Sequence, residues 1–207
     1  MQTPDSSPHL IDAPRAAARR QQILHAAAQC FREHGFHGAS IALISKTAGM
    51  SPGHIYHYFE NKEAIIAAIV AQDLESLLTL TTELRAACNV RAALIERAAE
   101  GVADQLDPAG AALKLEIVAE AARNPRVAQI VRDADATCRR ELAITIGEIR
   151  RATGHEDTPA AIEHMVEVLA SLFEGLLVRT IRNPGLDRAR VAQRIQIAIN
   201  DLLDQPN

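Results

Sequence analysis

The stretch SIALISKTAGMSPGHIYHYFENK, residues 40–62, decides how the rest of the chain is interpreted. Its first half has the features of a short helix. Ser40 is a residue type that caps helix N-termini, and Gly49 supplies the left-handed conformation in which helices commonly end. Between them, apolar residues recur with the one-face spacing of a buried stripe at Ile41, Ile44 and Ala48. The sequence therefore predicts a helix over residues 41–48.

A second helix is expected directly after the glycine turn. Ser51 is again a cap residue, and Pro52 follows at the first helical position, where the missing N–H of proline removes no helical hydrogen bond. The predicted helix covers residues 52–59. Two short helices joined by a glycine-containing turn form a helix-turn-helix.

This second helix has one apolar and one polar face. At 100° per residue, Ile55 and Phe59 share the face that is directed to the core. The opposite face is small or polar, and a phenol ring on either flank can be half-buried while its hydroxyl reaches outward. These positions are Gly53, His54 and His57, with Tyr56 and Tyr58 on the flanks. Such a helix suits close approach to a polar groove.

A third helix is expected to begin at once, with Asn61 as its cap and Lys62 in its first turn. The helix dipole disfavours a cation at that end, so the placement indicates that an anion also binds there. Free helix N–H groups and a lysine ammonium together form a phosphate site. The alternative is an ordinary pair of helices with a solvated lysine.

The pattern S-I-x-x-I-x-x-x-A-G-M-S-x-G-x-I-Y-x-Y-F-x-N-K-E-x-I resembles the DNA-binding region of the TetR family of transcriptional regulators. The resemblance covers residues 15–70, with the turn residues, the aromatic residues and the trailing lysine all in register. It implies an all-helical, homodimeric and ligand-responsive regulator, usually a repressor. Its partners would be a palindromic operator in double-stranded DNA and a small-molecule effector.

The resemblance also implies roles for individual residues. Gly53, His54 and His57 would face the bases. The DNA backbone would be held by Ser40, Tyr56, Tyr58 and Lys62. Ser51 and Pro52, at the start of the second helix, complete the predicted DNA-binding residues. One departure is Ala42, where family members often carry arginine or another polar contact residue. Operator recognition should therefore depend more on the second helix.

Composition favours helices throughout the 207 residues, since 48% are hydrophobic and only 3% aromatic. We expect an all-α chain with a disordered arm at 1–12, a helix-turn-helix domain at 13–61 and a helical effector-binding and dimerisation domain at 62–207. The apolar runs are expected to be too short for a membrane span, and the N-terminus lacks a signal-peptide pattern. A cytoplasmic protein is expected.

Charge is distributed unevenly along the chain. Residues 1–62 carry six Lys or Arg against four Asp or Glu, a net charge of +2, whereas the whole chain has a net charge of −4. Six of the eight histidines also lie in these first 62 residues. A weakly basic segment followed by an acidic one is compatible with DNA binding through one end only.

Helix boundaries outside the motif follow from periodicity and caps. A first helix at 14–34 should end at Gly35, and a long connecting helix should follow Lys62. Cap residues before proline mark later helix starts at Asp107, Asn124 and Thr158. With Asn89 as a further cap, the predicted helices are 90–106, 108–123, 125–152, 159–182 and 187–204.

The last two of these helices carry a long apolar stripe. In TetR-family proteins the corresponding helices pair with their symmetry mates, and the stripe fits that role. The predicted dimer interface is Met165, Leu169, Leu172, Gly175, Leu176, Ile195, Ile199 and Leu202. The alternative is that these residues form a core within the chain.

An effector pocket is expected among the helices between residues 65 and 180. The candidate lining residues are Leu113, Glu116, Ile117, Glu120 and Phe173, although such glutamates commonly face solvent. Because Phe173 is the only aromatic residue after the motif, an aliphatic or amphipathic effector fits better than a flat cation. We expect no metal, no cofactor and no disulfide, since the three cysteines have no ligand spacing.

The leading interpretation is a homodimeric repressor that a small molecule releases from its operator. A constitutive DNA-binding protein without an effector is the alternative. A carrier or enzyme that has lost DNA binding is more remote, because the sequence has no G-x-S-x-G, H-E-x-x-H or glycine-rich phosphate motif.

Overall fold

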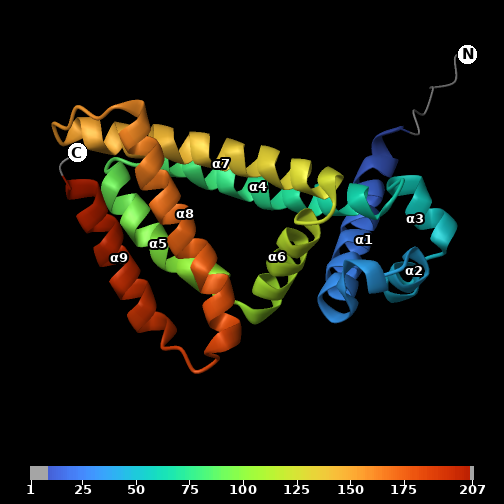
Figure 1. The fold of residues 1–207 in the computed structure, drawn as a ribbon. Coiled ribbons are helices and arrows are strands. Elements are labelled where there is room, and N and C mark those ends of the chain that lie inside the picture. The colour runs from blue at the N-terminus through green and yellow to red at the C-terminus, as the bar shows by residue number, and fades with distance from the viewer. Residues whose placement is uncertain (1–8, 206–207) are drawn as a thin grey trace, which may run out of the picture. The chain divides into compact units, whose positions relative to one another are not determined.

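The computed structural model describes residues 9–205, and the side chains from residue 14 onward. In this part of the chain there are nine helices and no strand, which confirms the predicted all-α class (Figure 1). The helices are α1 (His9–Gly38), α2 (Ile41–Ala48), α3 (Pro52–Tyr58), α4 (Lys62–Ala86), α5 (Val90–Gln105), α6 (Pro108–Ala121), α7 (Pro125–Ala152), α8 (Pro159–Arg182) and α9 (Arg188–Asp204).

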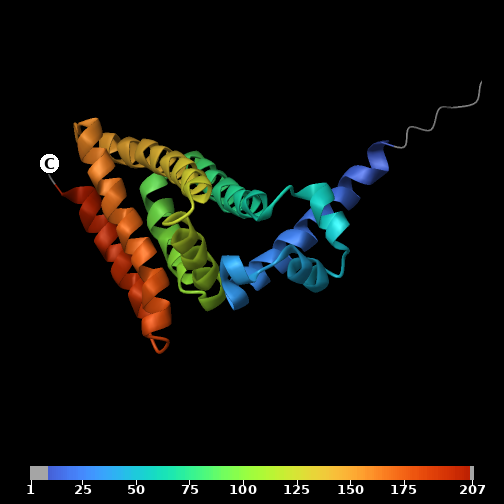
Figure 2. The same cartoon turned by 45° about the vertical axis from the view of Figure 1, so that its right-hand side comes forward.

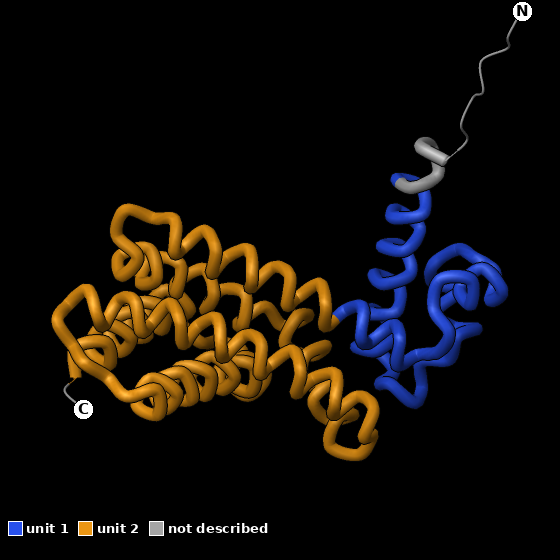
Figure 3. Tube along the Cα trace, turned by 90° about the horizontal axis from the view of Figure 1, so that it is seen from above, with its two compact units in different colours: residues 1–69 blue, residues 70–207 orange. Residues whose placement is uncertain are grey.

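The chain divides into two compact units, residues 1–69 (unit 1) and residues 70–207 (unit 2), which Figure 3 colours separately. The division lies beyond the expected boundary at 61/62, because the first two turns of α4 pack in unit 1. Of the expected arm at 1–12, residues 1–8 lie outside the described residues, and residues 9–12 belong to α1.

Unit 1 is built around the second half of α1, which packs against α2. An apolar stripe on α1 faces inward, with Ile23, Ala27 and Phe31 at most 1% exposed. At Gly35 the backbone leaves the helical region, with φ 68° and ψ 169°, so the predicted helix end is a break in α1. One more turn, through Gly38, follows that break.

The caps predicted in unit 1 are all present. The Ser40 Oγ accepts a hydrogen bond from the Leu43 N–H at 3.1 Å, and the Ser51 Oγ accepts one from the His54 N–H at 3.3 Å. Gly49 ends α2 with φ 64°. The Asn61 side chain accepts from the Ala64 N–H at 2.8 Å. These bonds satisfy N–H groups that helix starts would otherwise leave unpaired.

Caps also start the helices of unit 2. Each cap side chain accepts a hydrogen bond from a backbone N–H of the first turn: Asn89, Asp107, Asn124, Thr158 and Asp187. The predicted bounds of α7 and α8 are those observed. The bounds of α5, α6 and α9 differ from the predicted ones by one or two residues at one end.

In unit 2, α5 packs against both α8 and α9, and α6 packs against α7 and α8 (Figures 1 and 2). Their buried side chains form one aliphatic core. Five of the eight residues predicted for the dimer interface are at most 8% exposed and belong to this core: Met165, Leu169, Leu176, Ile195 and Ile199. Leu202 packs against the same core. These six residues therefore pack within the chain, and their part in a dimer interface stays a prediction.

Unit 2 encloses an arginine side chain. Arg150 on α7 is only 1% exposed and donates to both carboxylate oxygens of Asp157, at 2.5 and 2.7 Å. Its remaining terminal nitrogen donates to the backbone oxygens of Leu203 and Gln205 at 2.8 and 2.7 Å. Arg150 thus connects α7, the segment before α8 and the end of α9. Such a fully paired arrangement is needed to keep a charge out of water.

One helix meets a length and composition criterion for a membrane span, contrary to expectation. It is α4, with 25 residues and a mean hydropathy of 1.5 over its most apolar window, of which 22% is buried. Asp73 and Glu75 lie in the middle of this helix. Carboxylates at the centre of a bilayer are energetically unfavourable, so length and composition are weak evidence here.

Candidate DNA-binding site

The candidate site is the outward face of α3, and the structure places its residues as predicted. Ile55 is completely buried and Phe59, directly after the helix, is 3% exposed. The small and polar residues of the opposite face are exposed: Gly53, His54 and His57, together with Tyr56, which is 56% exposed. The face offers imidazole and phenol groups that donate and accept hydrogen bonds.

Three rings on this face contact one another. The centroids of His54 and Tyr58 are 5.3 Å apart, and those of His57 and Tyr58 are 5.2 Å apart. The two imidazoles lie nearly parallel at 6.5 Å. Tyr58 is half-buried between them and the helix, so it restricts the orientation of both histidines. The surface is therefore partly ordered before any partner binds.

Ser40 and Ser51 are exposed at the starts of α2 and α3. Each hydroxyl oxygen already accepts a cap hydrogen bond, but the O–H can still donate to an external acceptor such as a phosphate oxygen. Pro52 is exposed beside Ser51. Ala42, the departure from the family pattern, is also exposed and offers no polar atom.

Polar contacts that sequence reasoning missed hold α3 and α2 on α1. The Gln22 amide donates to the Ala48 carbonyl oxygen at 2.7 Å, at the end of α2. The guanidinium of Arg20 lies 5.0 Å from the centre of the Phe59 ring. The only sequence signal was that Arg20 and Gln22 border the apolar stripe of α1. Neither partner follows from periodicity.

Lys62 has a partner that the sequence did not predict. Its Nζ donates to the backbone oxygen of Phe36 at 2.5 Å and lies 4.3 Å from the centre of the Phe36 ring. Lys62 is half-buried at the first position of α4. The ammonium is therefore engaged within unit 1.

The five candidate effector residues are partly or fully engaged in contacts within unit 2. Glu120 is 1% exposed and is bound by Arg123 at 2.8 Å and by the Asn124 amide at 3.1 Å, so its carboxylate is used at the end of its own helix. Glu116 lies 4.0 Å from Arg123. Phe173 lies beside Gly101 of α5, and Ile117 is buried. Leu113 is half-buried.

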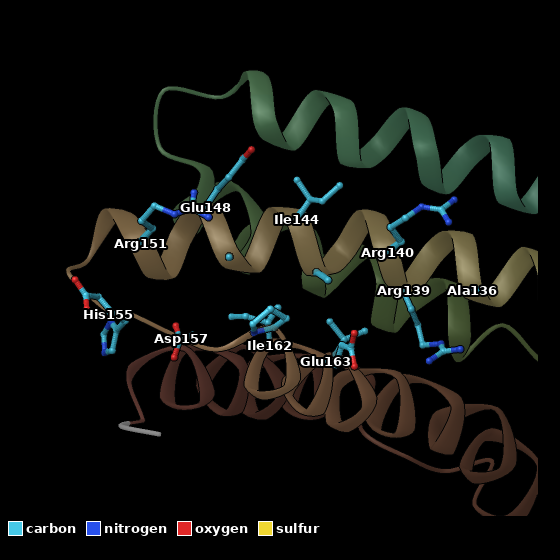
Figure 4. Close-up of a pocket in the computed structure, with 15 residues that line it drawn as sticks. Ala136, Arg139, Arg140, Ile144, Glu148, Arg151, His155, Asp157, Ile162 and Glu163 are labelled. Atoms are coloured by element: carbon cyan, nitrogen blue, oxygen red, sulfur yellow. The ribbon is translucent and has the colours of Figure 1, made fainter.

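A groove of ≈ 840 Å³ lies instead between α7 and α8. Its lining combines apolar residues, including Ala143, Gly147 and Ile162, with charges of both signs. In Figure 4, Arg139 and Glu163 both lie in the gap between the two helices. The groove is open, and its surroundings suit an amphipathic occupant better than a purely apolar one.

Family models match both units. Residues 23–69 match the model described as bacterial regulatory proteins, tetR family. Residues 93–204, more than half of the chain, match the model described as BetI-type transcriptional repressor, C-terminal. The chain belongs to the TetR family. Proteins of this family are transcriptional regulators, and the helix-turn-helix described above is their DNA-binding element.

Known relatives agree with this assignment. The solved structure of Salmonella enterica GusR is 31% identical, has a TM-score of 0.77, and covers 94% of this TetR-family chain and 100% of its own. The HTH-type transcriptional regulator UidR of Escherichia coli K12 is 37% identical over 118 residues, 57% of this chain and 59% of UidR. The HTH-type transcriptional repressor AcnR of Corynebacterium diphtheriae is 38% identical over 74 residues, 36% of this chain and 39% of AcnR.

The chain thus spans about 59% of the length of the UidR sequence that it matches. What the comparisons support is a DNA-binding transcriptional regulator, with repressors among its relatives.

Proposed function

We propose that this protein is a homodimeric cytoplasmic repressor that binds a palindromic operator and is released by a small molecule. The observation that carries the proposal is the outward face of α3, where exposed imidazole and phenol groups stand on a short helix that is capped and packed against α2. Helices of this kind enter the major groove, where base edges present distinct donors and acceptors.

Within this face, Gly53, His54 and His57 are proposed to approach the bases, and Ser40, Ser51, Pro52, Tyr56 and Tyr58 to contact the backbone. Gly53 is informative because a Cβ at this position would meet no atom within 4 Å in the free protein. A methyl group there leaves the fold undisturbed and reduces only the space available to a partner.

The experiment is selection of bound duplexes from a random DNA library, followed by affinity measurements on the enriched sequence. We expect a palindrome whose half-sites lie about one helical turn, or a multiple of it, apart. Gly53→Ala should reduce affinity for that palindrome by at least about tenfold while thermal stability stays equal or rises slightly. No enriched sequence at low salt would contradict the proposal.

Dimerisation is proposed to use the face of α8 that the chain itself leaves open. Val168 and Leu172 are 48% and 38% exposed, and a Cβ added at Gly175, on the same face, would have no neighbour within 4 Å. A small residue beside exposed apolar ones permits close approach of a second helix. Of the predicted interface residues, Leu172 and Gly175 are the ones available for this contact.

The mass of the particle in solution, measured by light scattering, tests the dimer. Leu172→Glu should convert dimers to monomers because a carboxylate would be buried in the interface. Val118→Glu is the matched control, since Val118 is 54% exposed on α6, away from this face. Equal masses for the two variants would exclude the proposed face.

An amphipathic effector is proposed to bind in unit 2, with the groove between α7 and α8 as its position. A compound library is tested for molecules that raise the unfolding temperature and also weaken operator binding. Gly147→Gln should fill the groove and abolish the response, whereas Ala122→Gln, at an exposed position outside the groove, should keep it. If an active compound affects both variants equally, it binds elsewhere. If no compound acts, the alternative of a constitutive DNA-binding protein is supported.

A further inference from the structure

The first residue of α4 is attached to the break in α1. At Gly35 the backbone of α1 leaves the helical region, and the following residue is Phe36. In a continuing helix the Phe36 carbonyl would accept from the N–H of Ser40, but that N–H bonds to the Gly38 oxygen at 3.1 Å. The Lys62 ammonium donates to the Phe36 oxygen at 2.5 Å.

The same ammonium also contacts the Phe36 side chain. Its nitrogen lies 4.3 Å from the ring centre, within the range of a cation–π interaction. Phe36 is 4% exposed, and its ring lies 5.6 Å from that of Phe31 in the core of unit 1. Lys62 is therefore bound to a residue that the core holds in place.

These contacts account for a lysine at an unfavourable position. A cation at a helix N-terminus is disfavoured by the helix dipole, and the sequence alone attributed it to a bound phosphate. A carbonyl oxygen and the negative face of an aromatic ring provide the compensating charge within the protein itself. No external anion is needed to explain the placement.

We propose that Lys62 is a positioning residue, which joins the end of α1 to the start of α4 and so fixes the frame in which α2 and α3 are held. The contact joins the two ends of the segment that contains α2 and α3, since these helices connect Gly38 to Lys62. The consequence for DNA affinity depends on the proposed function, but the structural role does not.

Three variants of the full-length protein test this role without DNA. Lys62→Met removes the ammonium with little change in side-chain length, and Lys62→Arg keeps a donor. Lys46→Met is the matched control, because Lys46 is an exposed lysine in the last turn of α2 and its removal changes the charge equally. Hydrogen exchange is followed for the backbone amides of residues 36–40 and 62–66.

Lys62→Met should accelerate exchange in both segments by about tenfold or more, with a melting temperature lower by about 2 °C or more. Lys46→Met should leave exchange unchanged, and Lys62→Arg should lie between the wild-type protein and Lys62→Met. Exchange in Lys62→Met equal to that in Lys46→Met would overturn the proposal.

The salt dependence of DNA binding gives a second readout. A positioning residue affects affinity without removing a phosphate contact, so the slope of log K against log[salt] should be the same for Lys62→Met and the wild-type protein. A slope smaller by about 0.9, with exchange unaffected, would identify Lys62 as a phosphate ligand instead. If the wild-type protein binds no DNA, the proposed function fails, and hydrogen exchange still decides the role of Lys62.

Discussion

Unit 1 and unit 2 are stabilised by interactions of different range along the chain. In unit 1, the helices α2 and α3 have only 8 and 7 residues, and each begins at a serine whose side chain accepts a hydrogen bond from the N–H three residues later. A glycine ends α2. In unit 2, long helices depend on contacts between distant residues, such as Arg150 with Leu203 and Gln205. Local signals set the ends of the short helices in unit 1, whereas contacts between residues that are far apart in the sequence join the long helices of unit 2.

The comparison also separates the chemistry of the two units. Unit 1 contains all but one of the Phe and Tyr residues, and its aromatic rings lie both in its core and on its surface. The core of unit 2 is aliphatic, with Phe173 at its margin. The rings proposed to bind DNA therefore belong to a unit whose core also contains aromatic rings, whereas the aliphatic core of unit 2 can repack with small changes in shape.

The largest effect should come from the enclosed arginine of unit 2. Arg150→Ala removes the hydrogen bonds that Arg150 donates to the Asp157 carboxylate and to two backbone oxygens, so the free energy of unfolding should fall by about 3–5 kcal/mol. Urea denaturation measures this change. Arg151→Ala is the control, because Arg151 is the adjacent exposed arginine, and it should change stability by less than about 0.5 kcal/mol. Similar losses in both variants would show that the long-range contacts of Arg150 are unimportant.

A smaller and local effect should come from a cap in unit 1. Ser51→Ala removes the acceptor for the His54 N–H, so α3 should lose about 1 kcal/mol of stability. Hydrogen exchange should accelerate in residues 52–58 only. Ser76→Ala is the control, since the Ser76 hydroxyl only bonds back to the Gln72 oxygen within α4. Acceleration spread across unit 2 would contradict the distinction between local and long-range stabilisation.

The acid sensitivity of unit 2 should depend in part on the pairing of α5 with α9. The hydrogen bond from Arg91 lowers the pKa of Asp204 below its usual value. A lowered pKa adds stability above the unfolded-state value of about 3.9, and this is lost as pH falls through the lower folded-state value. In Asp204→Asn the decrease in melting temperature between pH 7 and pH 3 should be smaller by about 1 °C. An unchanged decrease would show that Asp204 does not contribute to the acid sensitivity of unit 2.

The smallest predicted difference is that between the reactivities of the three cysteine thiols, and measuring it requires no change to the fold. Cys88 is exposed, Cys30 is buried in unit 1, and burial raises the pKa of the Cys138 thiol in unit 2. A raised pKa lowers the fraction of reactive thiolate at neutral pH. Mass spectrometry of the iodoacetamide-treated native protein should find Cys88 modified first, then Cys138, and Cys30 last. Early modification of Cys30 would indicate that unit 1 opens more readily than its caps imply.

Sequence reasoning was most successful where the determinants are close together. Caps, glycines and proline positions predicted α2 and the bounds of α7 and α8, because each signal acts within a few residues of the helix end that it sets. The face of α3 was predicted for the same reason, since helical periodicity alone decides which residues lie opposite Ile55.

Contacts between residues that lie far apart in the chain could not be predicted from the sequence. The stripe on α8 and α9 is wide enough for two neighbours, and periodicity does not say which neighbour each residue contacts. Met165 and Ile195 therefore lie in the core of the chain, and Val168, which was not among the predicted interface residues, is exposed. Likewise, the sequence did not show that Phe36, 26 residues before Lys62, lies beside the lysine for which a phosphate partner was predicted. Glu120, a candidate residue for an effector pocket, is bound by Arg123 and Asn124.

The two tyrosines of the chain, Tyr56 and Tyr58, both lie on α3, and the sequence contains no tryptophan. Tyrosine emission from the unlabelled protein therefore originates in α3 alone. Quenching of that emission reports directly on what happens at this surface, with no dye attached. A compound that binds in unit 2 and alters the emission must transmit its influence along the chain, so one cuvette measurement reveals communication between the units.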